Sequence, residues 1–212
     1  MSGDGPTIWL ARTGERGFAL TDCVDAGVVA LRYDSVPDAR DLSIPEIAGA
    51  VDTAGTRTNS TMVAGMLHRF VHDVDAGDVV VTTHLESRSV YFGEVTGDYR
   101  FADPSPVPGF LHMRPVDWFG KLDRDTDVPT KRRSDIDKQP SFYELTDQDY
   151  WLERAEEART ATAEVRPPRR TPGPKAPASA GGPAETPSQV CISCGLRKPS
   201  GIITDGICRD CD

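Results

Sequence analysis

Three runs rich in β-branched and aromatic residues, all within residues 77–118, constrain the fold of this chain most. They occupy residues 77–82, 89–99 and 112–118. Runs of this kind, separated by turn residues, are typical of the strands of a small sheet or barrel. Val79 and Val81 alternate with their neighbours, which predicts at least one buried face. Gly93 interrupts the second run, and a glycine inside a strand marks a bulge or the close approach of another group.

Two more strands and three helices are expected around these runs. The strands are Thr7–Arg12 and Gly27–Tyr33, and the helices run from Ser43 to about Val51, from Ser60 to about Val74 and from Asp147 to about Thr160. Ser43 and Glu46 have the spacing of a capping box. The second helix has one apolar face at helical spacing, which we expect in the core. Its members are Val63, Met66, Leu67, Phe70 and Val71. Thr146 is expected to cap the third helix.

The C-terminal part of the chain has a different composition. Hydrophobic residues make up 38% of the 212 residues, and the segment Pro167–Pro187 holds seven prolines but no Ile, Leu, Val or aromatic residue. Such a segment buries too little apolar surface to offset its ordering entropy. The sequence therefore predicts a folded domain over residues 1–163, a disordered linker over 164–189 and a small module over 190–212. The basic residues of the linker either contact nucleic acid or belong to a plain spacer.

The charge of the chain is unevenly distributed. Residues 1–163 carry 17 Lys and Arg against 28 Asp and Glu, a net charge of −11, within a total of −9. An acidic domain argues against strong non-specific DNA binding, which depends on neutralising phosphates. No run of 18 apolar residues predicts a membrane span. The first residues lack the basic and apolar regions of a signal peptide, so we expect the protein to be located in the reducing cytoplasm.

Two C-x2-C pairs form the most specific motif of the sequence. They are Cys191 with Cys194 and Cys208 with Cys211, separated by 13 residues. This spacing predicts one zinc ion held by four thiolates, and because such a site has no open position, its role is structural. Two disulfides are the alternative, which the absence of an export signal disfavours. The fifth cysteine, Cys23, is expected to be an ordinary thiol.

The sequence contains none of the common catalytic motifs. A glycine-rich phosphate loop and a nucleophile elbow are both missing. His68 and His72 are four residues apart, but no third metal ligand accompanies them. We therefore expect a protein that is not an enzyme.

The order of these motifs resembles a known family. The runs GDVVVT, YFGEVTGDY and HMRPVDW, with Trp9, Arg12 and Gly14 before them and Phe142–Leu145 after them, are similar to the PUA/EVE-like domain at the N-terminus of Mrr-type restriction system proteins. The resemblance covers roughly the first 150 residues. It implies an α+β fold, a PUA/EVE-like β-barrel with short flanking helices. It also implies a pocket that holds one extruded base of a nucleic acid. The C-terminal module, which would follow the barrel after the linker, resembles small zinc ribbons and treble-clef-like modules, which bind nucleic acid in some proteins and protein partners in others.

Nine residues are candidates for that pocket. The aromatic candidates are Trp9, Tyr33, Tyr91, Phe92 and Trp118, and the basic candidates for its rim are Arg12, Arg32, His112 and Arg114. Each aromatic residue fits the core equally well, and we expect at least two of the five to be core. The relatives close the second strand with Gly-Trp, where this chain has Arg32-Tyr33. The resemblance therefore does not predict which ligand this chain prefers.

Two hypotheses for function follow. The first is a non-enzymatic nucleic-acid reader of the restriction or defence type, which binds modified bases in DNA. Mrr-type relatives carry a separate nuclease domain after the reader, whereas this chain has the linker and the zinc module there, so cleavage would come from a partner such as a nuclease. The second is a protein-interaction adaptor that uses the barrel and the zinc module as a scaffold. A concave aromatic pocket with a positive rim favours the reader, and a convex acidic surface with an apolar patch favours the adaptor.

Overall fold

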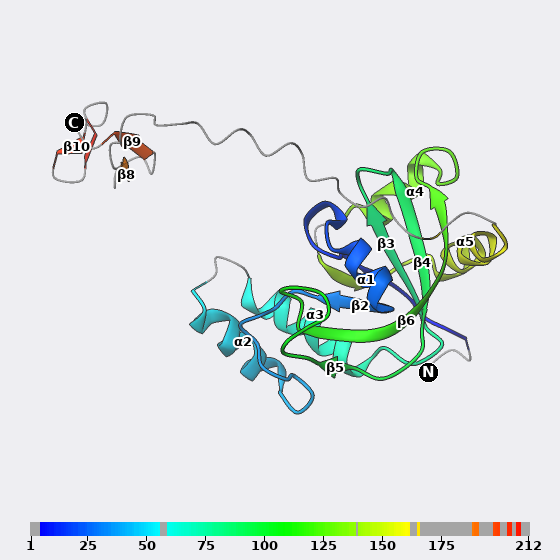
Figure 1. Ribbon diagram of the computed structural model, residues 1–212, viewed down its shortest axis with the longest axis horizontal. Coiled ribbons are helices and arrows are strands. Elements are labelled where there is room, and N and C mark those ends of the chain that lie inside the picture. The colour runs from blue at the N-terminus through cyan, green and yellow to red at the C-terminus, as the bar shows by residue number, and fades with distance from the viewer. Residues whose placement is uncertain are drawn as a thin grey trace. The chain divides into compact units, whose positions relative to one another are not determined.

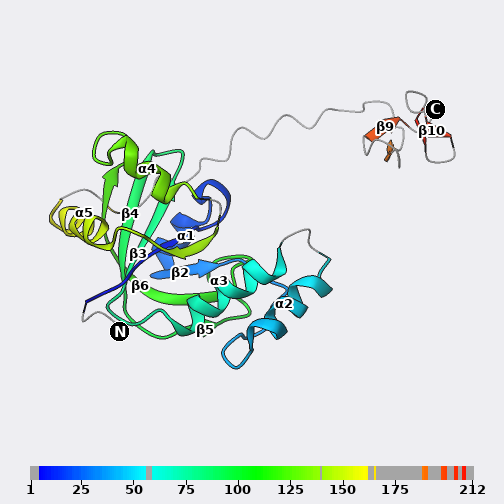
Figure 2. The ribbon, with the colours of Figure 1, turned by 180° about the vertical axis from the view of Figure 1, so that it is seen from behind.

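The computed structural model describes residues 5–55, 59–138, 140–161 and 165, together with the backbone of four short strands nearer the C-terminus. The chain forms two compact units, Met1–Arg169 and Arg170–Asp212. The first unit is an α+β domain in which a mixed sheet curls into a half-barrel (Figures 1 and 2). The α+β class expected from the sequence is therefore confirmed.

Seven strands form the sheet of the first unit. They are β1 (Ile8–Ala11), β2 (Val28–Leu31), β3 (Val79–His84), β4 (Ser89–Val95), β5 (Arg100–Phe101), β6 (His112–Asp123) and β7 (Phe142–Glu144). Their order is β2-β6-β4-β3-β1-β7, with β5 beside β6. β1 and β3 are parallel, and every other pair is antiparallel. The three runs of the sequence thus form the centre of the sheet.

The longest strand, β6, carries the bend of the sheet. Its first half pairs with β2 and its second half with β4. The register shifts between Phe92 and Gly93, which leaves Phe119 as an extra residue on β6. A bulge of one residue reverses the face to which later side chains point. Trp118 accordingly lies on one face of the sheet, whereas Leu122 lies on the other.

Gly93 is required at this bulge because there is no room for a side chain. An added Cβ would lie 2.4 Å from Cγ1 of Val116 and 2.9 Å from Cε3 of Trp118. The sequence prediction of a bulge or a close approach at this glycine is therefore confirmed on both counts. The groups that approach are the side chain of Val116 and the indole of Trp118, both within the domain.

Five α-helices and one short 3-10 helix surround the sheet in the described part of the first unit. They are η1 (Glu15–Gly17), α1 (Leu20–Ala26), α2 (Ile44–Thr53), α3 (Ser60–His72), α4 (Thr130–Ile136) and α5 (Gln148–Thr160). The Glu46 carboxylate accepts from the backbone N–H of Ser43 at 2.8 Å, as the capping box predicts. Asn59 caps α3 and Asp147 caps α5. The prediction of Thr146 as the last cap was wrong by one residue.

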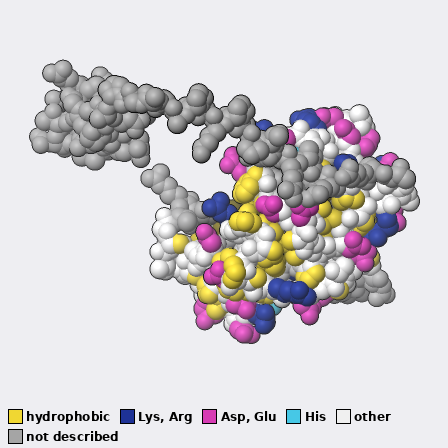
Figure 3. Space-filling view, in the orientation of Figure 1, with side chains coloured by type: hydrophobic (Ala, Val, Ile, Leu, Met, Phe, Trp, Pro, Cys, Tyr) yellow, Lys and Arg dark blue, Asp and Glu magenta, His cyan; other side chains and the backbone are white. Residues whose placement is uncertain are grey.

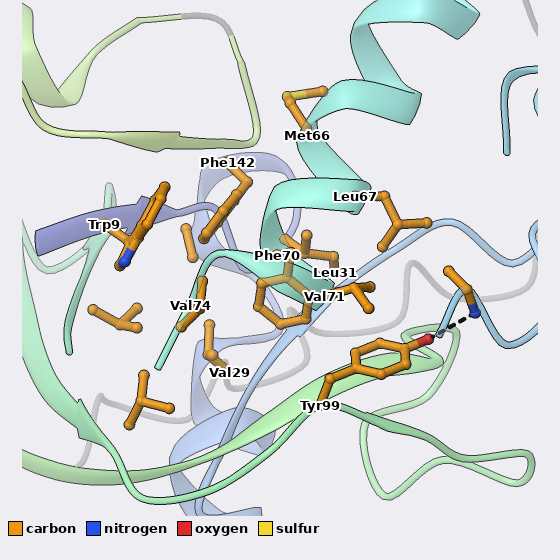
Figure 4. Packing of buried hydrophobic residues seen from close by; sticks show 14 of the residues in the cluster. Trp9, Val29, Leu31, Met66, Leu67, Phe70, Val71, Val74, Tyr99 and Phe142 are labelled. Atoms are coloured by element: carbon orange, nitrogen blue, oxygen red, sulfur yellow. Dashed lines mark hydrogen bonds between the residues drawn. The ribbon is translucent and has the colours of Figure 1, made fainter. Parts of the chain in front are cut away.

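Both faces of the sheet are buried. One face packs against α2 and α3, and this cluster includes Trp9, Val80 and Tyr91. Figure 4 shows Trp9 and Phe142 stacked beside Phe70 of α3 in this cluster. The opposite face, with Val81 among its residues, packs against α5. The all-valine run in β3 is thus explained by cover on two sides, as in strands of buried sheets.

The sequence did not predict several elements that complete the domain. α1, α4, β5 and β7 were not expected, and β6 extends five residues beyond the predicted end at Trp118. The predicted face of α3 is confirmed, because all five of its apolar residues are buried. No helix in the described part of the chain is long and apolar enough to cross a membrane.

Two small hairpins are described in the second unit. β8 (Ser188–Val190) pairs with β9 (Arg197–Pro199), and β10 (Ile203–Thr204) pairs with β11 (Ile207–Cys208). The predicted linker over 164–189 lies outside the described residues except at residue 165 and at the start of β8. The predicted boundaries of the three segments stay a prediction.

Candidate ligand-binding site

A pocket of about 220 Å³ opens beside one end of the sheet. Three of the nine candidate residues line it: Arg12, Arg32 and Tyr33. Five residues that were not candidates complete it: Gly14, Glu15, Leu31, Phe110 and Ser141. The pocket gathers residues that lie up to about 130 positions apart, and each of them lies at the end of a strand or in a segment that leads to or from one.

The floor of the pocket is apolar and well supported. Leu31 ends β2, and Phe110 lies just before β6; each is 1% exposed. The ring of Phe18, which is exposed, meets Phe110 edge-on at 5.8 Å between centroids. Gly14 has a φ of +83°, and a Cβ there would lie 2.3 Å from the Phe18 ring. This glycine therefore lets an aromatic ring cover the loop next to the pocket.

Hydrogen bonds to backbone carbonyl groups hold Arg12 in place. It follows β1, and its Nη2 donates to the carbonyl oxygens of Ile136, at 3.3 Å, and Lys138 at the end of α4. Its backbone N–H donates to the carbonyl of Ser141 at 2.8 Å. Its buried Nε has no hydrogen-bond partner within the described residues. The guanidinium thus anchors α4 while its remaining N–H groups stay near the pocket.

Tyr33 lines one side of the pocket, where hydrogen bonds fix its position and its hydroxyl is neutral. Its hydroxyl hydrogen-bonds to the Ser141 hydroxyl, and its carbonyl oxygen accepts from Nε2 of His112 at 3.1 Å. Burial raises the pKa of Tyr33 above its ordinary value, against the smaller opposing effect of the Ser141 hydrogen bond. The ring is therefore presented in one orientation, which suits stacking of a flat ligand.

Arg32 is the exposed basic residue of the pocket. Within the described part of the chain its side chain makes no hydrogen bond and no ion pair, although Glu15 also lines the pocket. A guanidinium offers five N–H donors in a planar fork. An unpaired fork beside a tyrosine ring can bind a carbonyl, carboxylate or phosphate oxygen of a ligand.

Four of the five aromatic candidates lie in the core. Trp9, Tyr91, Phe92 and Trp118 are at most 9% exposed. Nε1 of Trp9 donates to Oδ2 of the buried Asp78 at 2.8 Å, and Nε1 of Trp118 donates to the Val28 carbonyl at 3.2 Å. The expectation that at least two of these aromatics are core is confirmed. The structure does not bring these four side chains to the pocket that Tyr33 lines.

His112 and Arg114 are also buried, at 0% and 4% exposure. Nδ1 of His112 contacts the hydroxyl of Tyr99 at 2.8 Å, and that hydroxyl accepts from the backbone N–H of Ala39 at 3.2 Å. Burial lowers the pKa of His112, so its neutral form with a proton on Nε2 fits these partners. His112 therefore supports Tyr33 from inside the domain rather than forming the rim. Arg114 lines a different pocket.

The pocket residues that sequence reasoning missed had weak signals. Phe110 follows the proline-rich segment 104–108, which reads as a loop, and Ser141 follows α4, which is too short for its periodicity to show. Only their contacts in the folded chain place them beside β2 and β1.

The structure does not describe the side chains of the four predicted zinc ligands. Cys191, Cys194 and Cys211 lie outside the described residues, and only the backbone of Cys208 is described. In the remaining described residues, no group of three or more His, Cys, Asp or Glu side chains could hold a metal ion. The pKa of the Cys23 thiol is raised to about 12, mainly by burial, which agrees with an ordinary, unreactive thiol.

The structure is thus an α+β domain with a pocket that is lined by residues at or near the ends of its strands. A family model described as "Domain of unknown function (DUF8426)" matches residues 8–146, and the chain belongs to this family. The matched range begins with β1, ends just after β7 and includes every residue that lines the pocket. The comparisons with curated proteins and with solved structures found no match.

Proposed function

We propose that this protein is a non-enzymatic reader of nucleic acid that holds one base, a modified base of DNA, in the pocket that Arg32 and Tyr33 line. In this proposal the curled sheet is a PUA/EVE-like barrel, as the resemblance of residues 77–118 implies. A flipped base gains stacking on an aromatic face and hydrogen bonds at its edge. Tyr33 and Phe110 supply the apolar surface, and the two arginines supply donors.

The pocket size supports a single flat ligand. Its volume of about 220 Å³ lies below the roughly 300–1,000 Å³ of pockets for drug-sized molecules. The unpaired fork of Arg32 is the observation that carries the proposal, because a charged donor next to an aromatic wall is the combination that a base needs. Bidentate arginine contacts to base edges contribute about 1–3 kcal/mol of discrimination.

The charge of the domain shapes how such binding would behave. Figure 3 shows acidic side chains spread over the visible face, with Lys and Arg between them. With a net charge of −11 over residues 1–163, non-specific affinity should be weak and should fall further with salt. Stacking on one base depends much less on salt. Discrimination between bases should therefore persist at moderate salt while total binding falls.

The test is a binding screen of the full chain against single- and double-stranded oligonucleotides with and without cytosine and adenine modifications. A modified oligonucleotide should bind better than its plain counterpart. Tyr33→Ala should remove about 1–3 kcal/mol of that binding, the usual size of a base–aromatic stack. Tyr33→Phe keeps the ring and loses only the contact with Ser141, so it should retain most of the affinity.

Equal binding of every modified oligonucleotide and its plain counterpart would overturn the reader. In that case the adaptor hypothesis replaces it, since the acidic surface and the exposed ring of Phe18 suit a protein partner. A protein that reads a base without cutting would also need a partner, such as a nuclease, for any cleavage.

We also propose that the second unit is a structural zinc ribbon with Cys191, Cys194, Cys208 and Cys211 as ligands. In sequence, the first pair falls between Val190 and Arg197, which face each other in the β8–β9 hairpin. Cys208 lies in β11 of the other hairpin. In sequence, one C-x2-C pair thus falls within or next to each hairpin, and this spacing supports a zinc ribbon.

Metal analysis tests this second proposal. The purified protein should contain about one zinc per chain, as four thiolates per ion require. The Cys191→Ser/Cys208→Ser variant should lose that zinc, whereas Cys23→Ser should keep it because Cys23 is buried in the other unit. Full zinc content in the double variant would refute the assignment.

A further inference from the structure

A second pocket, of about 490 Å³, lies at the C-terminal end of α3. Its lining comes from α3, from the loop between β2 and α2, from the residues before β5 and from β6: Arg40, Val71, His72, Asp98, Tyr99 and Arg114. Apart from Arg114, none of these residues was a candidate from the sequence, and none of them lines the pocket of Arg32 and Tyr33. Three of the six residues are basic types.

Arg114 is a buried charge without a carboxylate partner. It is 4% exposed, and within the described residues no carboxylate lies close enough for an ion pair. Nε donates to the Phe70 carbonyl at 2.8 Å, Nη2 to the Val71 carbonyl at 2.7 Å, and Nη1 weakly to a third carbonyl at 3.4 Å. Buried charges in proteins are normally paired. These three contacts fix the guanidinium, and two of its five N–H groups have no partner within the described residues.

The helix end explains only part of this arrangement. Cations at the C-terminus of a helix interact favourably with its free carbonyl groups, so Arg114 stabilises α3. Carbonyl groups are dipoles, however, and they do not neutralise a full charge. Burial lowers the pKa of Arg114, and the carboxylates of Asp98, Asp75 and Asp78 oppose that effect from beyond ion-pair distance.

The outer wall of the pocket carries further donors. Arg40 is exposed and makes only a loose ion pair with Asp38, at 3.5 Å. His72 is exposed on the last turn of α3. The hydroxyl of Tyr99 contacts His112 and Ala39, as Figure 4 shows in part, so it supports the wall. An anion between Arg114 and Arg40 would meet one fixed and one adaptable guanidinium.

We propose that this second pocket binds a phosphate group, with Arg114 as the fixed donor and Arg40 and His72 as the donors at the opening. Arginine forks match the oxygens of phosphate geometrically and form charge-assisted hydrogen bonds with them. The pocket is larger than a bare anion needs, so it has room for a phosphate ester such as a nucleotide unit. Asp98 reduces the affinity, because its charge repels the same anion.

This site does not depend on the base pocket. It rests on Arg114 and its surroundings alone, and a phosphate ion needs no base for recognition. The phosphate can come from a nucleic-acid backbone or from a small phosphorylated molecule. The two sources share the same chemistry at the pocket and differ in what else binds.

The experiment measures the thermal unfolding of the full chain with inorganic phosphate, against chloride at equal ionic strength. A ligand that binds only the folded state raises the midpoint with its concentration. Arg40→Gln should weaken phosphate binding about tenfold, the size of one charge-assisted hydrogen bond. Asp98→Asn should strengthen it, because a repelling charge is removed. Arg69→Gln removes one charge from the exposed side of α3 outside the pocket and should leave it unchanged.

Two outcomes would overturn the site: no phosphate-dependent stabilisation, or equal effects of Arg40→Gln and Arg69→Gln. Neither test requires a variant of Arg114, whose loss would leave buried carbonyl groups unpaired. A plain oligonucleotide then distinguishes the source. If a nucleic-acid backbone is the source, the oligonucleotide competes with inorganic phosphate. Arg40→Gln then reduces the slope of the logarithm of oligonucleotide affinity against the logarithm of salt concentration by about the value of one phosphate contact. If a small molecule is the source, the oligonucleotide does not compete.

Discussion

The middle of the sheet and its ends use the same residue types for different purposes. Trp9 lies in the middle of β1, stacks on Phe142 with 5.1 Å between ring centroids and gives its N–H to the buried Asp78. Tyr33 lies two residues beyond the end of β2 and has its ring beside a pocket. Arginines differ in the same way: Arg114 inside β6 donates to three carbonyls, whereas Arg32, just past β2, has no such partner within the described residues.

This difference has a physical cause. In the middle of a sheet that is covered on both faces, a large side chain must be packed and a polar atom must be paired. At a strand end, the backbone leaves the sheet and side chains can face solvent or a ligand. Position relative to the strand end, more than residue type, therefore separates the core from the candidate site.

The strongest way to break this comparison is to truncate a residue from the middle. Trp118→Ala should destabilise the domain by about 3–5 kcal/mol, because it removes a large buried side chain, leaves a cavity and unpairs the Val28 carbonyl. Chemical denaturation measures this loss. If Trp118→Ala keeps full stability and loses ligand binding, Trp118 belongs to the site and the division is wrong.

The second prediction concerns the close contact of β6 with α5. A Cβ at Gly120 would lie 2.2 Å from the carbonyl oxygen of Ala158, so Gly120→Ala must displace the helix. The expected cost is about 1–3 kcal/mol, as for other overpacked sites. Gly65 lies inside α3 with nothing within 4 Å of an added Cβ. Gly65→Ala should therefore stabilise by about 0.5–1 kcal/mol, and equal effects of the two variants would contradict the packing described for α5.

The third prediction follows from the buried His112. Its pKa is lowered from 6.5 by burial, so the unfolded chain takes up a proton at a pH where the folded chain does not. The contribution of His112 is therefore complete above about pH 6.5 and is lost as the pH falls below that value. Denaturation at several pH values measures it. His112→Gln should show a weaker pH dependence than the unaltered chain.

Much of the sheet was predictable because its strands have strong local patterns. The break at Gly93 predicted a bulge or close contact, and the apolar spacing of residues 60–74 predicted α3 with its buried face. The parallel pairing of β1 with β3 joins residues about 70 positions apart, and no local pattern encodes that pairing. α1 and α4 have seven residues each, too few for a periodicity to be distinct.

The candidate site was predictable only in part. Arg12, Arg32 and Tyr33 were identified because they align with a family motif or depart from it. Trp9, Tyr91, Phe92 and Trp118 were candidates because they are aromatic residues within the motifs of the same resemblance. Helices cover both faces of the sheet and bury them: Trp9, Tyr91 and Trp118 pack on the face of α2 and α3, whereas Phe92 packs on the face of α5. Phe110 and Ser141 required knowledge of how their loops fold back on β1 and β2.

The last prediction has the smallest effect on stability and compares the two arginines directly. Arg32→Gln should change the free energy of unfolding by no more than about 0.5 kcal/mol, because the side chain is exposed and contacts no partner in the described part of the chain. The same variant should lose about 1–3 kcal/mol of binding to whichever oligonucleotide the protein prefers, the value of one guanidinium–base contact. Arg114→Gln should show the reverse order of effects, because it leaves the carbonyls of Phe70 and Val71 unpaired at the end of α3. Denaturation and binding measured on both variants test the comparison. If Arg32→Gln destabilises the domain as much as Arg114→Gln does, Arg32 is a structural residue, and the distinction between the ends and the middle of the sheet fails.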